Sequence, residues 1–428
     1  MSEDERSAMR AYVLHPELKV AGSKRSSEPA LAEAVALGDA LPDLDVVGAE
    51  IVRLPKLHPG MLFGKGKIAE LKQRIHDAEA GLVLIDGPVS PVQQRNLEKE
   101  WGVKLLDRTG LILEIFSDRA RTKEGVLQVE MAALTYQRTR LVRAWTHLER
   151  QRGGLGFVGG PGETQIEADR RAIDTQLNRL RAQLAKVQKT RALHRAGRAK
   201  VPYPTVALVG YTNAGKSTLF NKMTGADVFV KDMLFATLDP TMRKIEFPTG
   251  ETVIFSDTVG FVSDLPTELV AAFRATLEEV LEADVILHVR DISHPQSQDQ
   301  WAEVVTILGV LGVSKDTPQI EVWNKIDNLP ADEAEAQRII AKRTGKYVTS
   351  AITGEGVAEL LDHVLAEVTD PKTHEMLQIG WNDAASHAFL HEMGVVDDSR
   401  ENAEGWQVDV TWSRRDRDRF HKKRRDRR

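Results

Sequence analysis

Eight consecutive residues from Gly210 to Ser217, with the sequence GYTNAGKS, match the phosphate-binding pattern G-x-x-x-x-G-K-S/T. They follow the apolar run VALVG, which favours a strand, and precede a segment typical of a helix beginning near Ser217. In this context backbone N–H groups surround a β-phosphate at the positive end of the helix. We predict that Lys216 reaches the β- and γ-phosphates and that Ser217 gives a hydroxyl to Mg²⁺. The nucleotide ligands predicted in this loop are Gly210, Tyr211, Thr212, Asn213, Ala214, Gly215, Lys216 and Ser217.

A second string, DTVG, lies at the end of the apolar run TVIFSDT, which also favours a strand. Its aspartate therefore emerges at the carboxyl edge of the predicted sheet, where ligands bind in folds of this kind. We predict that Asp257 holds Mg²⁺ through water, and that the Gly260 N–H bonds the γ-phosphate, so that the next segment is a switch. A D-x-x-G string alone is more often a simple turn, so the prediction depends on this placement. It covers Asp257, Thr258, Val259 and Gly260.

A third string, NKID, ends the predicted strand IEVWNKID and favours guanine over adenine. The Asp327 carboxylate can accept hydrogen bonds from the N1–H and the exocyclic amine of guanine, whereas adenine has an acceptor at N1. Such mispairing discriminates by about 10⁴-fold in well-built sites. We expect Asn324 to tie this loop to the phosphate loop, the Lys325 stem to cover the base, and the backbone N–H groups of Ser350 and Ala351 to reach guanine O6. The residues predicted around the base are Asn324, Lys325, Ile326, Asp327, Ser350, Ala351 and Ile352.

These strings belong to an alternating pattern of strands and helices, so we predict an α/β nucleotide domain with a mostly parallel sheet at residues 204–368. Residues 1–121 show the same alternation and predict a smaller α/β domain. Within it, the GKGK string at 64–67 could present two lysines to a phosphate. A loop followed by a helix start explains that string more simply. Residues 369–428 predict a small C-terminal domain whose fold the sequence leaves open.

Two apolar runs at heptad spacing predict an antiparallel helical hairpin over residues 122–195. The joining segment, GGLGFVGGPGE at 153–163, contains six glycines, which let a backbone approach another surface closely. We predict a basic tip that contacts another molecule, and a long turn with incidental charge is the alternative. The two runs are Leu127, Met131, Leu134, Leu141, Trp145 and Leu148, then Ile166, Ile173, Leu177, Leu180, Leu184 and Val187. The arginines around the tip are Arg150, Arg152, Arg170 and Arg171.

The composition, 428 residues with 42% hydrophobic and 28% charged, is typical of a soluble globular protein with several domains. The absence of cysteine excludes disulfides, thiolate zinc sites and cysteine nucleophiles. No apolar run is long enough for a membrane span or a signal peptide, so we expect a cytoplasmic protein, and a monomer. Residues 411–428 carry ten Lys or Arg against three Asp, which is a net charge of +7. Since the whole chain has a net charge of −5, the other residues together have a net charge of −12. With Trp412 and Phe420 interleaved, this end is typical of binding to a polyanion such as RNA, and a solvated tail without a specific partner is the alternative.

The ordered set GYTNAGKS, DTVG, NKID and TSA resembles the translation-factor-related GTPases. Four further strings resemble the HflX family in particular, and the resemblance covers residues 10 to about 370. It implies a ribosome-associated GTPase that binds the large ribosomal subunit and its RNA and dissociates stalled or idle ribosomes. The four strings are LFGKGKIAEL at 62–71, RGGLGFVGGPGETQIEADRR at 152–171, LFATLDPT at 234–241 and DTVGF at 257–261.

The same resemblance implies that a switch I threonine, Thr237 here, ligates Mg²⁺. The run that it places along the nucleotide is Phe235, Ala236, Thr237, Leu238 and Asp239. Together with the motifs above, this gives Ser217, Thr237 and Asp257 as metal ligands. We expect Lys216, Thr237 and Gly260 to act in hydrolysis.

Phe261 stands where many switch GTPases have a glutamine that orients the attacking water. Phenylalanine neither donates nor accepts a hydrogen bond, so we predict slow hydrolysis by the isolated protein and a partner that supplies or positions a catalytic group. Asn213 resembles the asparagine that coordinates K⁺ in some related GTPases. A loop asparagine that bonds only backbone is the alternative.

Two other classes of function compete with a ribosome-binding switch. A kinase for a small substrate uses the same phosphate loop, but NKID has no purpose in an ATP site and the sequence shows no further acid/base cluster. A switch with a non-ribosomal RNA or a membrane-surface partner would use the basic end. The absence of a lipidation signal argues against the membrane surface.

Overall fold

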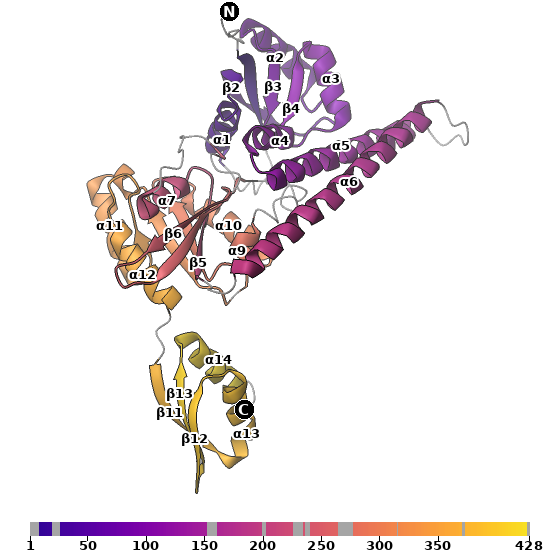
Figure 1. The fold of residues 1–428 in the computed structure, drawn as a ribbon. Helices are drawn as coiled ribbons and strands as arrows, with labels where there is room; N and C mark the ends of the chain where they lie inside the picture. The colour runs from indigo at the N-terminus through magenta and orange to yellow at the C-terminus, as the bar shows by residue number, and fades with distance from the viewer. Residues whose placement is uncertain are drawn as a thin grey trace, which may run out of the picture.

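The computed structural model describes residues 8–18, 26–151, 161–198, 203–225, 234–235, 240–263, 277–314, 316–369 and 373–425. Three sheets and a pair of long helices organise these residues (Figure 1). The fold is α/β, as the sequence predicts. No helix of the described residues is long and apolar enough to cross a membrane.

The first sheet has four parallel strands in the order β2-β1-β3-β4. Alternate residues of β1 face opposite layers: Leu14 packs toward the helices α2 and α3, and Val13 toward α1 and α4. Lys67, in the first turn of α2, pairs with Glu50 at 3.8 Å and with Glu70 at 3.2 Å, which favours the helix-start interpretation of GKGK. The elements are β1 Met9–Leu18, α1 Ser27–Asp39, β2 Leu44–Leu54, α2 Lys65–Asp77, β3 Leu82–Ile85, α3 Pro91–Trp101, β4 Lys104–Asp107 and α4 Arg108–Arg119.

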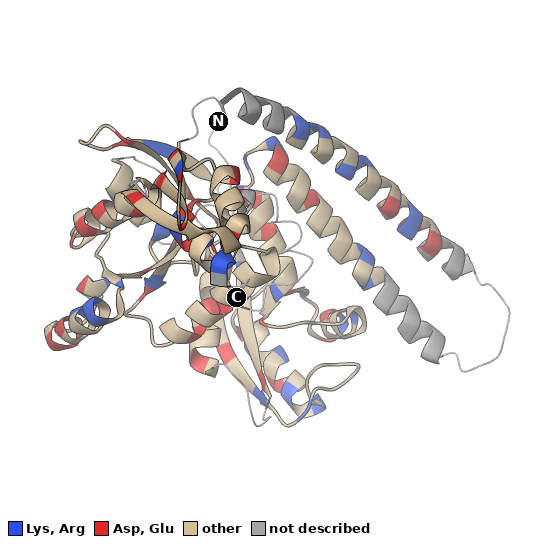
Figure 2. Ribbon diagram, turned by 90° about the horizontal axis from the view of Figure 1, so that it is seen from below, with Lys and Arg blue, Asp and Glu red and all other residues tan. Residues whose placement is uncertain are grey.

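The helices α5, Lys123–Gln151, and α6, Pro161–Arg198, lie side by side and project from the body (Figure 1). Leu177 and Leu180 of the predicted seam are buried, and an ion pair of 2.8 Å between Arg138 and Asp174 joins the two helices. Figure 2 shows basic and acidic residues interspersed along them. The glycine-rich residues 152–160 lie outside the described residues.

The second sheet has six strands in the order β10-β9-β8-β5-β7-β6, and only the pairing of β6 with β7 is antiparallel. Both faces of β5 are buried, because Val206 and Leu208 face one core cluster while Ala207 and Val209 face the other. The elements are β5 Thr205–Gly210, α7 Lys216–Thr224, β6 Thr241–Glu246, β7 Thr252–Asp257, α9 Glu278–Leu281, β8 Val285–Asp291, α10 Ser297–Leu311, β9 Gln319–Asn324, η1 Ile326–Asn328, α11 Ala331–Thr344, β10 Tyr347–Val348 and α12 Val357–Thr369.

The third sheet is antiparallel in the order β11-β13-β12 and carries two helices. Trp412 and Phe420 are fully buried in its core, with ring centroids 5.5 Å apart. Their apolar rings hold α14 on the sheet and are not exposed to a ligand, so binding of a polyanion by the basic residues of this end stays a prediction. Residues 414–425 form the helix α14, so a disordered tail is wrong as far as residue 425. The elements are β11 Thr373–Gly380, η2 Trp381–Asp383, α13 Ala384–Glu392, β12 Val396–Asn402, β13 Gly405–Trp412 and α14 Arg414–Arg425.

Candidate nucleotide-binding site

The loop between β5 and α7 has glycine where close packing requires it. A Cβ atom on Gly210 would lie 2.1 Å from the Val289 carbonyl oxygen. Gly215 has φ +85°, and a Cβ atom there would lie 2.3 Å from Nδ2 of Asn324. The loop therefore folds tightly over the carboxyl ends of β8 and β9, and α7 begins directly after it at Lys216.

Lys216 is buried at the base of this loop. Its Nζ atom donates to the carbonyl oxygens of Gly210, at 3.1 Å, and Tyr211, at 2.9 Å. The pKa of Lys216 is lowered to about 8, mainly by burial, which Asp257 partly opposes and to which Lys325 adds. The lowered pKa indicates that the two carbonyls and Asp257 compensate this ammonium only in part, so the site favours an added anion such as a polyphosphate.

The oxygen atoms of Ser217 and Asp257 form the candidate metal centre. The Ser217 hydroxyl donates to Oδ2 of Asp257 at 2.7 Å, so a hydroxyl and a buried carboxylate converge beside the phosphate loop. These are the hard oxygen donors that Mg²⁺ prefers, and they fit the ion that the motifs predict. Thr237, with Ala236, Leu238 and Asp239, lies outside the described residues.

The segment after Asp257 is joined to the phosphate loop through its main chain. The Phe261 N–H donates to the Gly210 carbonyl at 3.1 Å, and the Thr212 N–H donates to the Phe261 carbonyl at 2.6 Å. A Cβ atom on Gly260 would lie 2.9 Å from Lys216 Nζ, so this glycine borders the candidate γ-phosphate position. The Phe261 side chain is buried and presents no polar atom to a water molecule.

Asn324 ties its own loop to the phosphate loop, as the sequence predicts, and also binds the turn after β10. Its Nδ2 donates to the Ala214 carbonyl at 2.9 Å, and its Oδ1 accepts from the Thr349 hydroxyl at 3.2 Å and the Ala351 N–H at 3.1 Å. Asp327, three residues further on, is exposed. The polar end of β9 is therefore fixed to the phosphate loop, while the carboxylate predicted to read guanine faces outward.

The residues after β10 differ in part from the expectation. The Ser350 N–H donates to the Glu355 carbonyl at 3.0 Å, and the Ala351 N–H donates to Asn324. Both amides expected to reach guanine O6 are thus engaged within the protein, because the turn after β10 closes on itself. Ile352, the next residue, has a largely exposed side chain.

The ring of Phe235 faces α4 of the N-terminal domain. The ring is buried and packs edge-on against Phe116 of α4, with centroids 4.6 Å apart. The ring lies where the domains of the first two sheets meet, and the placement of the run from Phe235 to Asp239 along the nucleotide stays a prediction.

Asp291 is a residue that the motif reasoning missed. Its Oδ2 lies 2.8 Å from Nζ of Lys325, whose backbone has φ +64°. Asp291 closes β8, and in the register of the sheet it is the partner of Asn324. An aspartate at the carboxyl end of a parallel strand was the available signal.

The chain matches three protein families in succession. They are described as "GTP-binding GTPase N-terminal" over residues 28–117, "GTP-binding GTPase Middle Region" over 119–198 and "50S ribosome-binding GTPase" over 205–325. It is similar to the GTPase HflX of Magnetococcus marinus, with 51% identity over 324 residues, 75% of this chain and 74% of that protein. With the GTPase HflX of Escherichia coli it shares 43% identity over 341 residues, 79% of each chain. A GTP-binding protein of Sulfolobus solfataricus, solved with GDP, aligns with a TM-score of 0.46 and 22% identity over 84% of this chain and 99% of that one.

Proposed function

The chain belongs to the HflX family of GTPases, and on that premise we propose that it is a switch which binds the large ribosomal subunit and dissociates stalled or idle ribosomes. GTP hydrolysis and guanine nucleotide binding follow from membership of this ribosome-associated family. The observation that supports the switch mechanism is the meeting of Lys216, Asp257 and Asn324 at one edge of the second sheet.

In this proposal the phosphate loop binds the β-phosphate, Lys216 bridges the β- and γ-phosphates, and Asp327 reads guanine. Mg²⁺, when bound, neutralises phosphate charge, and Ser217, Asp257 and Thr237 would hold it. The Gly260 N–H contacts the γ-phosphate. Its release on hydrolysis changes the segment that follows.

Hydrolysis by the protein alone should be slow, because the buried Phe261 cannot orient water. The ribosome then supplies or positions the missing group. Asn213 has φ +58° in the phosphate loop, and we propose it as the K⁺ ligand. A bound cation there would stabilise negative charge that develops on the phosphates.

The hairpin formed by α5 and α6 would carry its glycine-rich end to ribosomal RNA. Arg170 and Arg171 are exposed on α6 near that end, where cations can neutralise phosphates. Replacing residues 153–162 with a short Gly-Ser turn should leave GTP affinity and basal hydrolysis unchanged. It should abolish stimulation of the GTPase by large subunits and the separation of subunits on a gradient.

A pair of double variants tests the charge contribution on the same helix. Arg170→Ala with Arg171→Ala should weaken subunit binding. The slope of log affinity against log salt concentration should become shallower by about 0.7 to 0.9 for each phosphate that the variant no longer neutralises. Arg179→Ala with Arg181→Ala, also exposed on α6 but further along it, is the matched control. If the turn variant separates subunits like the wild type, the hairpin has no part in the function.

A further inference from the structure

Tyr211, the second residue of the phosphate loop, directs its hydroxyl to Glu33 and Ser263. The residue is buried, and its hydroxyl lies 2.8 Å from Oε2 of Glu33 in α1 and 2.5 Å from Oγ of Ser263. The same hydroxyl accepts the Ser263 N–H at 2.7 Å. One side chain thus joins the phosphate loop to the N-terminal domain and to the segment that follows Gly260.

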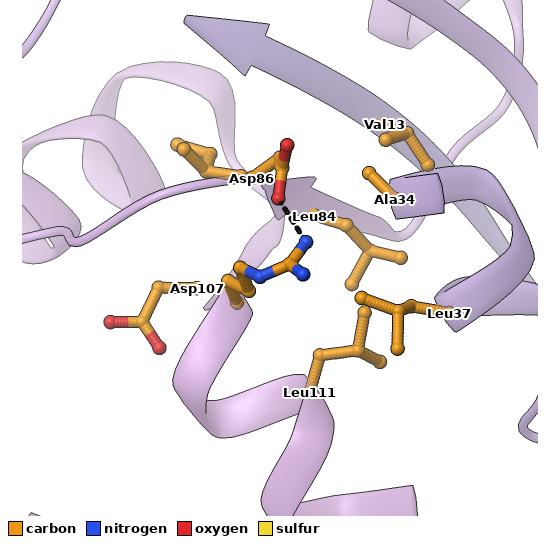
Figure 3. A pocket seen from close by; sticks show the side chains of 9 residues that line it. Val13, Ala34, Leu37, Leu84, Asp86, Asp107 and Leu111 are labelled. Atoms are coloured by element: carbon orange, nitrogen blue, oxygen red, sulfur yellow. Dashed lines mark hydrogen bonds and ion pairs between the residues drawn. The ribbon is translucent and has the colours of Figure 1, made fainter. Parts of the chain in front are cut away.

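The N-terminal domain also binds the segment that follows Gly260, through Arg108. Arg108, the first residue of α4, donates from Nη2 to the Ser263 carbonyl at 2.9 Å and pairs with Glu33. Its Nη1 lies 2.7 Å from Asp86, which in turn bonds His15 at 2.7 Å. Figure 3 shows Asp86 beside apolar side chains from α1, β1, β3 and α4, and Arg108 lines the same pocket. The guanidinium is buried and its orientation is fixed by two carboxylates.

The main chain from Gly260 to Ser263 is therefore held at both ends. At the near end Phe261 is bonded to Gly210 and Thr212 of the phosphate loop. At the far end the N–H and the carbonyl of Ser263 are bound by Tyr211 and Arg108. Four residues of chain have little freedom between two such anchors, so the position of the Gly260 amide depends on both.

We propose that Tyr211 and Arg108 are positioning residues for GTP hydrolysis, which hold Ser263 so that the Gly260 N–H stays at the γ-phosphate. This inference rests on the γ-phosphate contact of Gly260 in the proposed function. The N-terminal domain then takes part in nucleotide recognition without contacting nucleotide. Because GDP has no group at Gly260, loss of the positioning role would weaken the binding of GTP and not that of GDP. Loss of a purely structural role would weaken the binding of both nucleotides equally.

The Tyr211→Phe variant of the full chain tests this, because it removes the hydroxyl and keeps the ring. The affinity for a non-hydrolysable GTP analogue should fall by about five- to tenfold, as expected if the hydrogen bond from the Gly260 N–H to the γ-phosphate is lost, while GDP affinity stays within about twofold. The rate of basal hydrolysis should fall as well. Tyr136→Phe is the matched control, since its hydroxyl also bonds a carboxylate, that of Asp107 at the end of β4, at 2.6 Å. That variant should leave the ratio of the two affinities unchanged.

A second variant keeps the test valid if Tyr211→Phe does not fold, which circular dichroism would show. Glu33→Gln lies in the N-terminal domain and weakens the ion pair with Arg108 and the hydrogen bond from the Tyr211 hydroxyl. It should shift the same ratio in the same direction by about two- to fivefold. Equal changes for both nucleotides, no change, or tighter binding of the analogue overturns the inference.

Lys216→Ala separates this outcome from failure of the proposed site. That variant must weaken binding of both GDP and the GTP analogue if the phosphate loop is correctly assigned. If it does not, the proposed nucleotide site is wrong. If it does and Tyr211→Phe leaves the affinity ratio unchanged, only the positioning role is wrong.

Discussion

The buried ammonium of Lys216 should make the stability of the nucleotide-free protein rise with pH in the alkaline range. Only 6% of the residue is exposed, and burial lowers its pKa from 10.5 to about 8. In the unfolded chain the lysine titrates with its ordinary pKa of about 10.4. Between these two values the unfolded state binds more protons than the folded state, so the free energy of unfolding increases as the pH rises.

The size of this effect follows from the pKa difference. At about 1.4 kcal/mol for each pH unit, the free energy of unfolding should increase by about 3 kcal/mol between about pH 8 and 10.5. Below pH 8 the lysine is protonated in both states and its contribution is constant. Lys216→Met keeps the length of the side chain and removes the charge. At pH 7 this variant, without nucleotide, should therefore be more stable than the wild type.

The assay is urea unfolding of both nucleotide-free proteins from pH 7 to pH 10. The difference between the two curves cancels the other titrating groups. Nucleotide binding should return a proton to the lysine, so calorimetry at pH 8 in two buffers should show uptake of about half a proton by the wild type alone. Parallel pH dependences for the two proteins would refute the reasoning about Lys216.

Three further substitutions test separate parts of the molecule. Asp327→Asn exchanges an acceptor for a donor and should make XTP the preferred nucleotide; unchanged GTP affinity in competition binding would remove the guanine assignment. Asp291→Asn weakens the contact with Lys325 Nζ and should reduce the affinity for GDP and for a GTP analogue alike, by about three- to tenfold, in calorimetry; wild-type affinities would contradict a role for Asp291. Trp412→Ala should destabilise the C-terminal domain by about 3 to 5 kcal/mol in thermal unfolding, with basal GTP hydrolysis intact; an unchanged melting curve would contradict its place in the core.

The sequence predicted the strands β5, β7 and β9 and the motif at the end of each, because apolar runs and glycine placement are local properties. Asn324 was predicted to bind the phosphate loop, and the Ala214 contact confirms it. The side chain of Tyr211 could not be placed from the sequence, since its partners Glu33 and Ser263 are 178 and 52 residues away.

At the C-terminal end, local composition suggested a role that the structure does not give to two aromatic residues. Trp412 and Phe420 lie among arginines and lysines in the sequence, and local composition favoured an RNA-binding tail. In the structure β11 pairs with β13 in an antiparallel sheet, and both rings are buried in the hydrophobic core between this sheet and its helices. Long-range strand pairing decides whether an aromatic residue in a basic segment is buried, and the charge of the segment gives no information about that pairing.

The central claim is that nucleotide state controls binding to the large ribosomal subunit, and co-sedimentation tests it most directly. The protein is centrifuged with purified large or small subunits in the presence of GDP or a non-hydrolysable GTP analogue. We predict that it sediments with large subunits in the presence of the analogue and is released with GDP. Binding that is independent of the nucleotide, or that is confined to small subunits, would contradict the account.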